Sequence, residues 1–283
     1  MALNESPQNR SGLHVRIWGA RGSVPTPERD KLGVGGNTSC VEVKLPSGES
    51  LIFDAGTGIR NLGFDLMRRS HKQHDLHLLL THFHWDHLQG LPFFAPLYLA
   101  ESTVTFHSGS PVEDLRQILG GQMVDPYFPM KFDLVAATMN FDQVTGEPSE
   151  LGGALVSTFA LHHPGGACGY RIDSGGRRVV YATDHEHGND AADLRLRHAA
   201  KGADLLLYDS QFTPSEIESH RGWGHSTWLE ATCVARDAGV KRLVLFHHDP
   251  GHNDAMMEAI LAEARREFPN TDLAIEGAEF PVG

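Results

Sequence analysis

Four side chains that could bind metal crowd into six positions of the segment THFHWDHLQG (81–90). They follow directly after LHLLL, an apolar run typical of a buried strand, and they are His82, His84, Asp86 and His87. In an extended segment His82 and His84 project to one side, and a turn at Asp86 lets the last two face a neighbouring point. Imidazole and carboxylate together suit zinc, manganese or iron. Because chance seldom places H-x-H-x-D-H after a buried strand, the spacing predicts a metal site rather than a pH-sensitive or decorative histidine cluster.

Six positions cannot complete two metal shells, so further ligands must come from the ends of other strands. Polar groups end three more apolar runs, in chain order: His162 or His163 after FAL, Asp184 after VVYAT, and His247 or His248 after RLVLF. Taken singly, each is more simply explained as a hydrogen-bonded histidine or a helix cap. Together with the first motif, they are predicted to be ligands at one edge of a sheet. Two metals about 3.5–4 Å apart can share a hydroxide and hold both ends of a displacement.

The segment RGWGHSTW (221–228) sets His225 between two glycines, a hydroxyl pair and two tryptophans. This mixture is wrong for a core strand and too aromatic for an ordinary exposed loop. His225 is either an exposed cap of the following helix or a group that transfers protons, since imidazole titrates near neutral pH. Thr227 and Glu230 have the spacing of a capping box that opens that helix.

Strand signals recur along the whole chain, and helical patterns fall between them. Runs such as LHVRIWGA, SLIFDAG, RRVVYAT and RLVLFH predict strands. Helices are predicted over 58–70, after Pro111, over 227–239 and over 254–268, the last with Asn253 as its cap. Many strands that alternate with a few helices predict a layered α/β domain.

No repeat and no Pro/Ser-rich linker divides the chain, so residues 13–283 are predicted to form one domain. Residues 1–12 are predicted to form a mobile tail. The stretch GGQMVDPYFPMKFD (120–133) breaks the pattern with two prolines and three aromatic residues. It is either a loop over a cleft or a hydrophobic plug beneath a turn.

The composition limits the function classes. A formal charge of −12 argues against an extended nucleic-acid footprint, which needs Lys and Arg to displace counterions from phosphates. A small phosphate substrate remains compatible, because bound divalent metals reverse the field inside one cleft. Three scattered cysteines and the absence of an apolar leader or an 18-residue apolar run predict a cytoplasmic protein without a membrane span. The sequence does not define the oligomeric state, and a homodimer is compatible with it.

In this order the motifs resemble the metallo-β-lactamase superfamily, whose fold is a four-layer αββα sandwich with two mixed sheets between helices. The resemblance runs from Val15 to His248 and includes GARGSVPTP, GGNTSCVEV and LIFDAGTG. Within the superfamily it is closest to the phosphodiesterase branch, which includes ribonuclease Z and the phosphoribosyl cyclic phosphodiesterases. It implies that Asp54 supports the metal ligands from behind.

The resemblance also implies two divalent metal ions, zinc in the first place, with manganese or iron as alternatives. Its pattern puts one ligand six positions before Gly169, which selects His163, and another directly after the last metal strand, which selects His247. Asp184 would bridge both ions. The first ion would be held by His82, His84 and His163, and the second by Asp86, His87 and His247.

Ribonuclease Z-like enzymes carry GHST ahead of a helix and of the last metal strand, and GHSTW stands in that place here. The resemblance therefore implies that His225 is the general acid, which protonates the leaving oxygen of a diester. Asp209 of LLLYDSQF would face it, where the family usually has the longer Glu. Asp86 is assigned both to the metal site and to the catalytic set.

Two departures from the family pattern narrow the predicted activity. Short ribonuclease Z inserts a long arm between its third histidine and its bridging aspartate to hold transfer RNA, whereas only 21 residues separate His163 from Asp184. Asp184 also stands where many true β-lactamases have Cys, which speaks against antibiotic hydrolysis. We therefore predict a dinuclear metal phosphodiesterase that cleaves a small or cyclic nucleotide-type diester with hydroxide formed at the metals.

Two alternatives remain at this point. A thioesterase or lactonase like glyoxalase II shares all seven metal ligands, but it does not need GHSTW, and little chain follows His247 to form its large helical domain. A catalytically silent metal- or nucleotide-sensing domain belongs to another class. The intact ligand set together with His225 argues against it, because sensing alone needs no proton donor.

Overall fold

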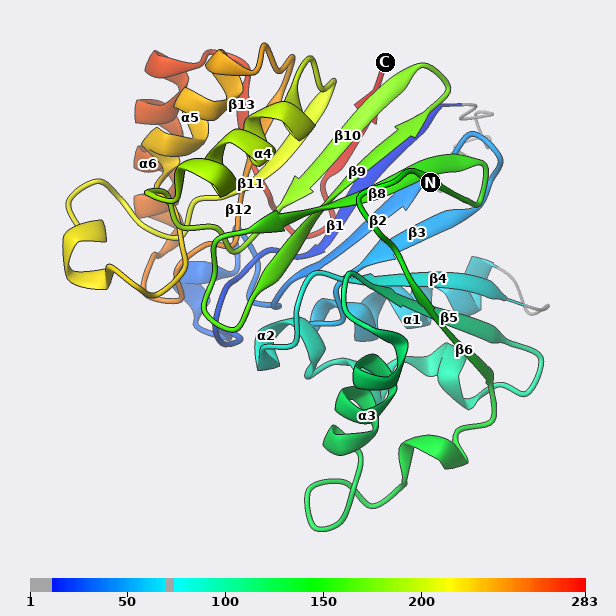
Figure 1. The fold of residues 1–283 in the computed structure, drawn as a ribbon. Helices are drawn as coiled ribbons and strands as arrows, with labels where there is room; N and C mark the ends of the chain where they lie inside the picture. The colour runs from blue at the N-terminus through cyan, green and yellow to red at the C-terminus, as the bar shows by residue number, and fades with distance from the viewer. Residues whose placement is uncertain (1–11, 70–73) are drawn as a thin grey trace, which may run out of the picture.

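The computed structural model describes residues 12–69 and 74–283, so the predicted tail lies, except for Gly12, outside the described residues. Two seven-stranded sheets dominate the fold (Figure 1). The first has the order β14 (Glu279–Val282), β1 (Leu13–Gly19), β2 (Cys40–Lys44), β3 (Ser50–Phe53), β4 (Asp75–Leu80), β5 (Thr103–Ser108) and β6 (Thr138–Gln143). The second has the order β13 (Thr271–Leu273), β12 (Leu243–Phe246), β11 (Leu205–Asp209), β10 (Arg177–Ala182), β9 (Ala167–Ser174), β8 (Ala154–Leu161) and β7 (Ser149–Leu151).

Both sheets are mixed. Strands β3 to β6 pair in parallel in the first sheet, and β10 to β13 do so in the second, while the remaining neighbours are antiparallel. The helices are α1 (Gly58–Arg69), α2 (Trp85–Leu88), α3 (Val112–Gln122), α4 (Asp190–Ala200), α5 (Trp228–Asp237) and α6 (Asp254–Glu267). None of the helices in the described part of the chain combines the length and the apolar character that a membrane crossing needs.

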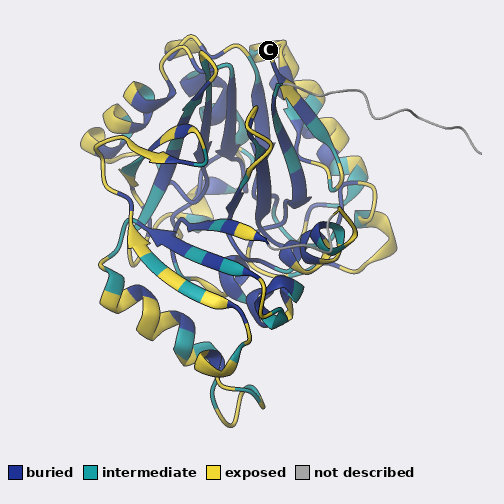
Figure 2. Ribbon diagram, turned by 90° about the vertical axis from the view of Figure 1, so that its right-hand side faces the viewer, coloured by how far each residue is buried: buried dark blue, intermediate teal, exposed yellow. Residues whose placement is uncertain are grey.

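Three apolar clusters define four layers. The central cluster joins the facing sides of the two sheets, with Val43 from one and Ile172 from the other. A second cluster packs the first sheet against α1 and α3, which contribute Leu62 and Leu115. A third packs the second sheet against α4, α5 and α6. Figure 2 shows the result, with buried strands inside and helices whose outer faces are exposed. The predicted four-layer αββα sandwich is confirmed.

The strands around the later site are buried because their sequences are apolar throughout. LLLYD in β11 and LVLF in β12 are buried at every position, which is typical of parallel strands covered on both faces. Strands β8, β10, β11 and β12 run in the same direction, so their carboxyl ends meet at one edge of the second sheet. Loops at this edge can therefore bring together residues from distant parts of the sequence.

The stretch 120–133 is anchored by two buried side chains, and most of its other residues are partly or fully exposed. Met123 and Phe132 are buried in the cluster beneath the first sheet, and Phe128 packs against that cluster. Tyr127 is 78% exposed at the tip. The plug interpretation therefore fits Met123 and Phe132, while residues 125–127 form an exposed loop.

The N-cap of α6 tests the helix start that was predicted from the sequence. The Asn253 side chain accepts a hydrogen bond from the Met256 amide at 3.0 Å, as the sequence predicts. Asn253→Ala should lower the free energy of unfolding by about 1 kcal/mol, because it leaves a helix N–H without a partner. Urea unfolding measures this loss, and Asn253→Asp, which keeps an acceptor oxygen, is the control. Equal stability of Asn253→Ala and the wild type would contradict the assignment.

Candidate metal centre

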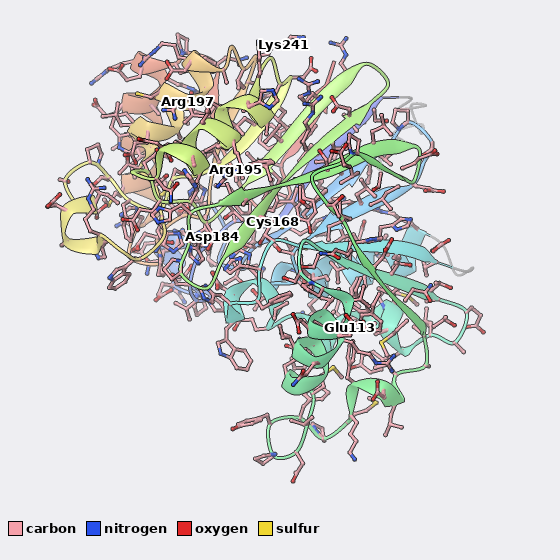
Figure 3. All side chains as sticks on the ribbon, viewed as in Figure 1. Glu113, Cys168, Asp184, Arg195, Arg197 and Lys241 are labelled. Atoms are coloured by element: carbon pink, nitrogen blue, oxygen red, sulfur yellow. The ribbon has the colours of Figure 1, made fainter. Side chains whose placement is uncertain are left out.

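The predicted ligands come together where strands of both sheets end. His82 follows β4, and α2, which begins three residues later, carries Asp86 and His87. His163, Asp184 and His247 follow β8, β10 and β12. Asp184 lies below the end of β10 in Figure 3, at one end of the sandwich. Parallel strand direction thus gathers side chains that are up to 165 positions apart in the sequence, from His82 to His247.

A first group of possible ligands is His82, His84, His163 and Asp184. One donor atom from each lies within 4.8 Å of the others. The Nδ1 of His84 is 3.0 Å from the Nε2 of His163. The Asp184 Oδ2 is 3.5 Å from the Nε2 of His82 and 3.7 Å from that of His163.

A second group lies beside the first and contains Asp86, His87 and His247, whose donor atoms are also within 4.8 Å of one another. The Asp184 Oδ1 faces this group, at 3.3 Å from the Nε2 of His87 and 3.4 Å from that of His247. Asp184 therefore directs one carboxylate oxygen to each group. This is the arrangement that a bridging ligand requires.

Hydrogen bonds on the far side of the rings fix which nitrogens are free. The Nδ1 of His87 donates to Asp54 at 2.9 Å, and the Nδ1 of His247 donates to the Gln211 Oε1 at 2.9 Å. Each Nε2 is then an acceptor with an outward lone pair. The two Nε2 atoms are only 3.2 Å apart. Two lone pairs at this distance repel each other unless a cation lies with them, so the donor set fits a metal ion.

The first group carries the same signature. The Nδ1 of His163 must hold a proton, because its partner at 2.9 Å is the Gly224 carbonyl, which can only accept. This leaves the Nε2 lone pair of His163 pointing at the Nδ1 of His84. The Nε2 of His82 is buried and has no hydrogen-bond partner in the described part of the chain. A buried nitrogen of this kind is explained by a metal that it ligates.

The charges at the site favour a cation. Burial by itself raises the pKa of Asp184, but His247, His87 and His82 hold that pKa well below its usual value. Burial lowers the pKa of His87, yet the nearby carboxylates of Asp184, Asp86 and Asp54 outweigh this effect and raise it. The site thus attracts positive charge at the His87 Nε2, where a proton and a metal compete.

His225 and Asp209 form a buried pair next to the metal ligands. The Nδ1 of His225 donates to the Asp209 Oδ2 at 2.8 Å, so the shorter Asp does reach the ring. Asp209 also accepts the amide N–H groups of Asp184 and Ser226. The His225 ring stacks on His247, with centroids 4.9 Å apart. Burial alone lowers the pKa of His225, but Asp209 reverses this and raises it to about 9.

Backbone strain is concentrated at the same edge. Asp54, Asp184 and His247 have φ values of 59°, 59° and 61°, in the left-handed region that residues other than glycine seldom adopt. All three lie in the turns that follow β3, β10 and β12. Such conformations persist where the surrounding contacts hold them, and they are typical of functional sites.

His162 and His248, the alternatives to His163 and His247 as ligands, form hydrogen bonds outside the candidate metal centre. His162 is exposed, and its Nδ1 donates to the Glu186 carbonyl at 2.9 Å. His248 is buried and bonds the Ala274 carbonyl through its Nε2, and burial lowers its pKa to about 3. The structure thus brings His163 and His247 to the site and turns His162 and His248 away from it.

A further histidine group behind the site does not suit a metal. The Nε2 of His185 lies 2.9 Å from Asp193, and His187 lies near the same carboxylate. The Nδ1 of His185 accepts the amide N–H of His162 at 3.1 Å, so its ring proton is on Nε2 and is donated to Asp193. No lone pair of His185 is left for an ion.

Sequence reasoning missed several groups that hold the site. Gln211 orients His247, the Ser23 amide donates to Asp86 at 2.7 Å, and Tyr181 donates to Asp54 at 2.9 Å. These residues are far from their partners in the sequence. No spacing or periodicity could have linked them.

Comparison with known proteins identifies the family. Residues 50–248 match the beta-lactamase superfamily domain. The chain belongs to this superfamily. Ribonuclease Z of Synechococcus sp. (strain WH7803) is 28% identical over 322 aligned residues, which cover 93% of this chain and 94% of that protein.

Solved structures support the same fold. YhfI of Bacillus subtilis, a metallo-beta-lactamase fold protein, matches with a TM-score of 0.72 and 20% identity over 95% of this chain and 98% of its own. A diphosphatase from the PhnP family matches with a TM-score of 0.70 and 20% identity over 95% and 97%. The predicted superfamily is confirmed, and with it the prediction of a metal-dependent hydrolase that resembles the phosphodiesterase branch.

Two variants, at His163 and at its neighbour His162, test which of the two histidines binds metal. His163→Ala should lose bound metal, because it removes a donor from the first group. His162→Ala, one position away and exposed, should retain it. Elemental analysis of the two purified proteins measures the difference. Metal loss in His162→Ala alone would show that the register is off by one residue.

Metal removal should also destabilise the protein. A ligand that binds only the folded state, at about 100 times its dissociation constant, adds about 2.7 kcal/mol to the free energy of unfolding. Differential scanning calorimetry with a chelator and with added zinc compares the two states. A melting temperature that is the same in both would contradict metal binding at these buried donors.

Proposed function

We propose that this protein is a dinuclear metal phosphodiesterase that hydrolyses a small or cyclic nucleotide-type diester. The observation that carries the proposal is the buried His225–Asp209 pair beside two ligand groups that share Asp184. Seven side chains would hold two divalent metals, zinc in the first place: His82, His84, Asp86, His87, His163, Asp184 and His247. When bound, such a pair supplies Lewis acidity and a nucleophilic water at neutral pH.

The residues of the chain supply positioning and a proton. The Nδ1–H of His225 donates a hydrogen bond to Asp209. The Nε2–H of the same ring is therefore the donor that can face a substrate. The Asp209 carboxylate raises the pKa of the ring and so favours the protonated form, which can give its proton to a departing alkoxide. The positive charge would also offset the charge that develops on the phosphate oxygens.

A small substrate is supported by the short connection between His163 and Asp184. It holds only the β9–β10 hairpin, with no additional arm. The alignment with the Synechococcus ribonuclease Z spans 322 positions, more than the 283 residues of this chain, so that relative contains segments that are absent here. The formal charge of −12 also disfavours a long nucleic-acid partner.

A direct assay separates this proposal from its alternatives. The zinc-loaded and manganese-loaded proteins are tested against bis-p-nitrophenyl phosphate, a thioester and a lactone. Metal-dependent cleavage of the diester supports the proposal. Activity on the thioester or lactone alone would point to glyoxalase II-like chemistry, and tight nucleotide binding without turnover would point to a sensing domain.

His225→Ala tests the general acid. It should retain both metals, because the His225 Nδ1 is already bonded to Asp209, and it should lower kcat about 10²–10⁴-fold. Steady-state kinetics and elemental analysis measure the two properties on the same preparation. His198→Ala is the control, because His198 is exposed in the last turn of α4 and belongs to none of the ligand groups. Unchanged turnover in His225→Ala would remove the general-acid role.

A further inference from the structure

We propose that Glu186 is a positioning residue that holds the His225 loop against the first metal group. This inference rests on the general-acid role proposed for His225. Glu186 lies two positions after Asp184 and is only 7% exposed. Its sequence context, TDHEHG, gives no indication of what a buried acid would do there.

The Glu186 carboxylate binds backbone N–H groups of the loop. The Gly222 amide donates to both carboxylate oxygens, at 2.9 and 3.0 Å, and the Gly224 amide donates to Oε2 at 2.8 Å. Hydrogen bonds to a carboxylate are stronger than bonds between neutral groups, so this contact is a firm anchor. It fixes the loop up to Gly224, the residue before His225.

The same loop segment supports a metal ligand. The Gly224 carbonyl accepts the Nδ1–H of His163 at 2.9 Å. Gly224 has a φ of 89°, and a Cβ at this position would lie 2.1 Å from the His163 Nδ1, so only glycine lets the loop approach so closely. Gly224 therefore orients His163 through its carbonyl and directly precedes His225, and Glu186 holds Gly224 through its amide.

The backbone of Glu186 completes the link. Its amide donates to the His162 carbonyl at 2.9 Å, and its carbonyl accepts from the His162 Nδ1 at the same distance. The carbonyl of the preceding residue, His185, accepts a hydrogen bond from the Ser226 hydroxyl at 2.6 Å. The turn after Asp184 is thus bonded both to the residue before His163 and to the loop on either side of His225. Displacement of this turn would move the general acid and the ligand together.

The variants Glu186→Ala and Glu186→Gln test this positioning role. Glu186→Ala removes both acceptor oxygens, whereas Glu186→Gln keeps one that can serve the Gly222 and Gly224 amides and should recover most of the activity. Glu218→Ala is the matched control, because Glu218 is an acid of the same loop whose side chain is 86% exposed. Thermal melts of all three show whether they are folded.

The kinetic readout is the dependence on the leaving group. Diphenyl phosphate expels phenoxide, which needs protonation more than the p-nitrophenoxide of bis-p-nitrophenyl phosphate does. Both His225→Ala and Glu186→Ala should lose at least about tenfold more kcat on diphenyl phosphate than on the nitrophenyl ester, as loss of a general acid requires. In the double variant Glu186→Ala/His225→Ala, the selective loss on diphenyl phosphate should be no larger than in His225→Ala alone, because Glu186 acts on the leaving group only through His225.

A second readout does not depend on turnover. Hydrogen exchange at the Gly222 and Gly224 amides should be faster in Glu186→Ala than in the wild type and in Glu218→Ala. Unchanged exchange overturns the inference whatever the activity is. An equal loss of kcat on both diesters in Glu186→Ala, with the expected selective loss in His225→Ala, overturns it while the proposed function stands. Absence of a selective loss in His225→Ala removes the general acid itself, and with it the catalytic part of the Glu186 role.

Discussion

The structure depends on one electrostatic constraint, which is that imidazole lone pairs and carboxylates are packed together in a buried space. The Nε2 atoms of His87 and His247 are 3.2 Å apart, and Asp184 turns one oxygen to each ligand group. Such a set is unfavourable without positive charge among its members. The strained turns at Asp54, Asp184 and His247 are the backbone consequence, since they aim these side chains at a common point.

The hydrogen bonds behind the ligands serve chemistry as much as stability. Asp54 and Gln211 accept hydrogen bonds from the Nδ1–H groups of His87 and His247. The Nε2 atom of each ring is thereby turned toward the candidate metal centre. Asp209 does the same for His225, but it also accepts the amide N–H of the bridging Asp184. The proposed proton donor, His225, and the proposed bridging ligand, Asp184, therefore share one buried carboxylate. These hydrogen bonds join the turn after β10 and the end of β11 to the loop that carries His225.

The layers of the sandwich restrict the conformations of the turns that carry the site. Strands that are buried on both faces leave little freedom to the turns that follow them, so the site inherits its geometry from the layers. Two elements that the sequence did not predict, β6 and α4, lie at the edge of the first sheet and on the outer face of the second. The edge strand β6, TMNFDQ, has mostly polar and partly exposed residues, and α4 exposes Leu194 by 70%, which blurs its apolar stripe. Weak periodicity at such positions hides an element that tertiary contacts still form.

The sequence by itself indicated the candidate metal ligands, because H-x-H-x-D-H after an apolar strand is a local pattern typical of metal sites, and because polar residues that end apolar strands mark a sheet edge. It also determined the caps of α5 and α6, which depend on residues three positions apart. Only the tertiary structure decided how Gln211, Ser23 and Glu186 act. Their partners lie 36, 63 and up to 38 positions away, and no local pattern encodes which backbone or ring such a side chain will meet. That pairing follows from the packing of two sheets, which is a property of the whole chain.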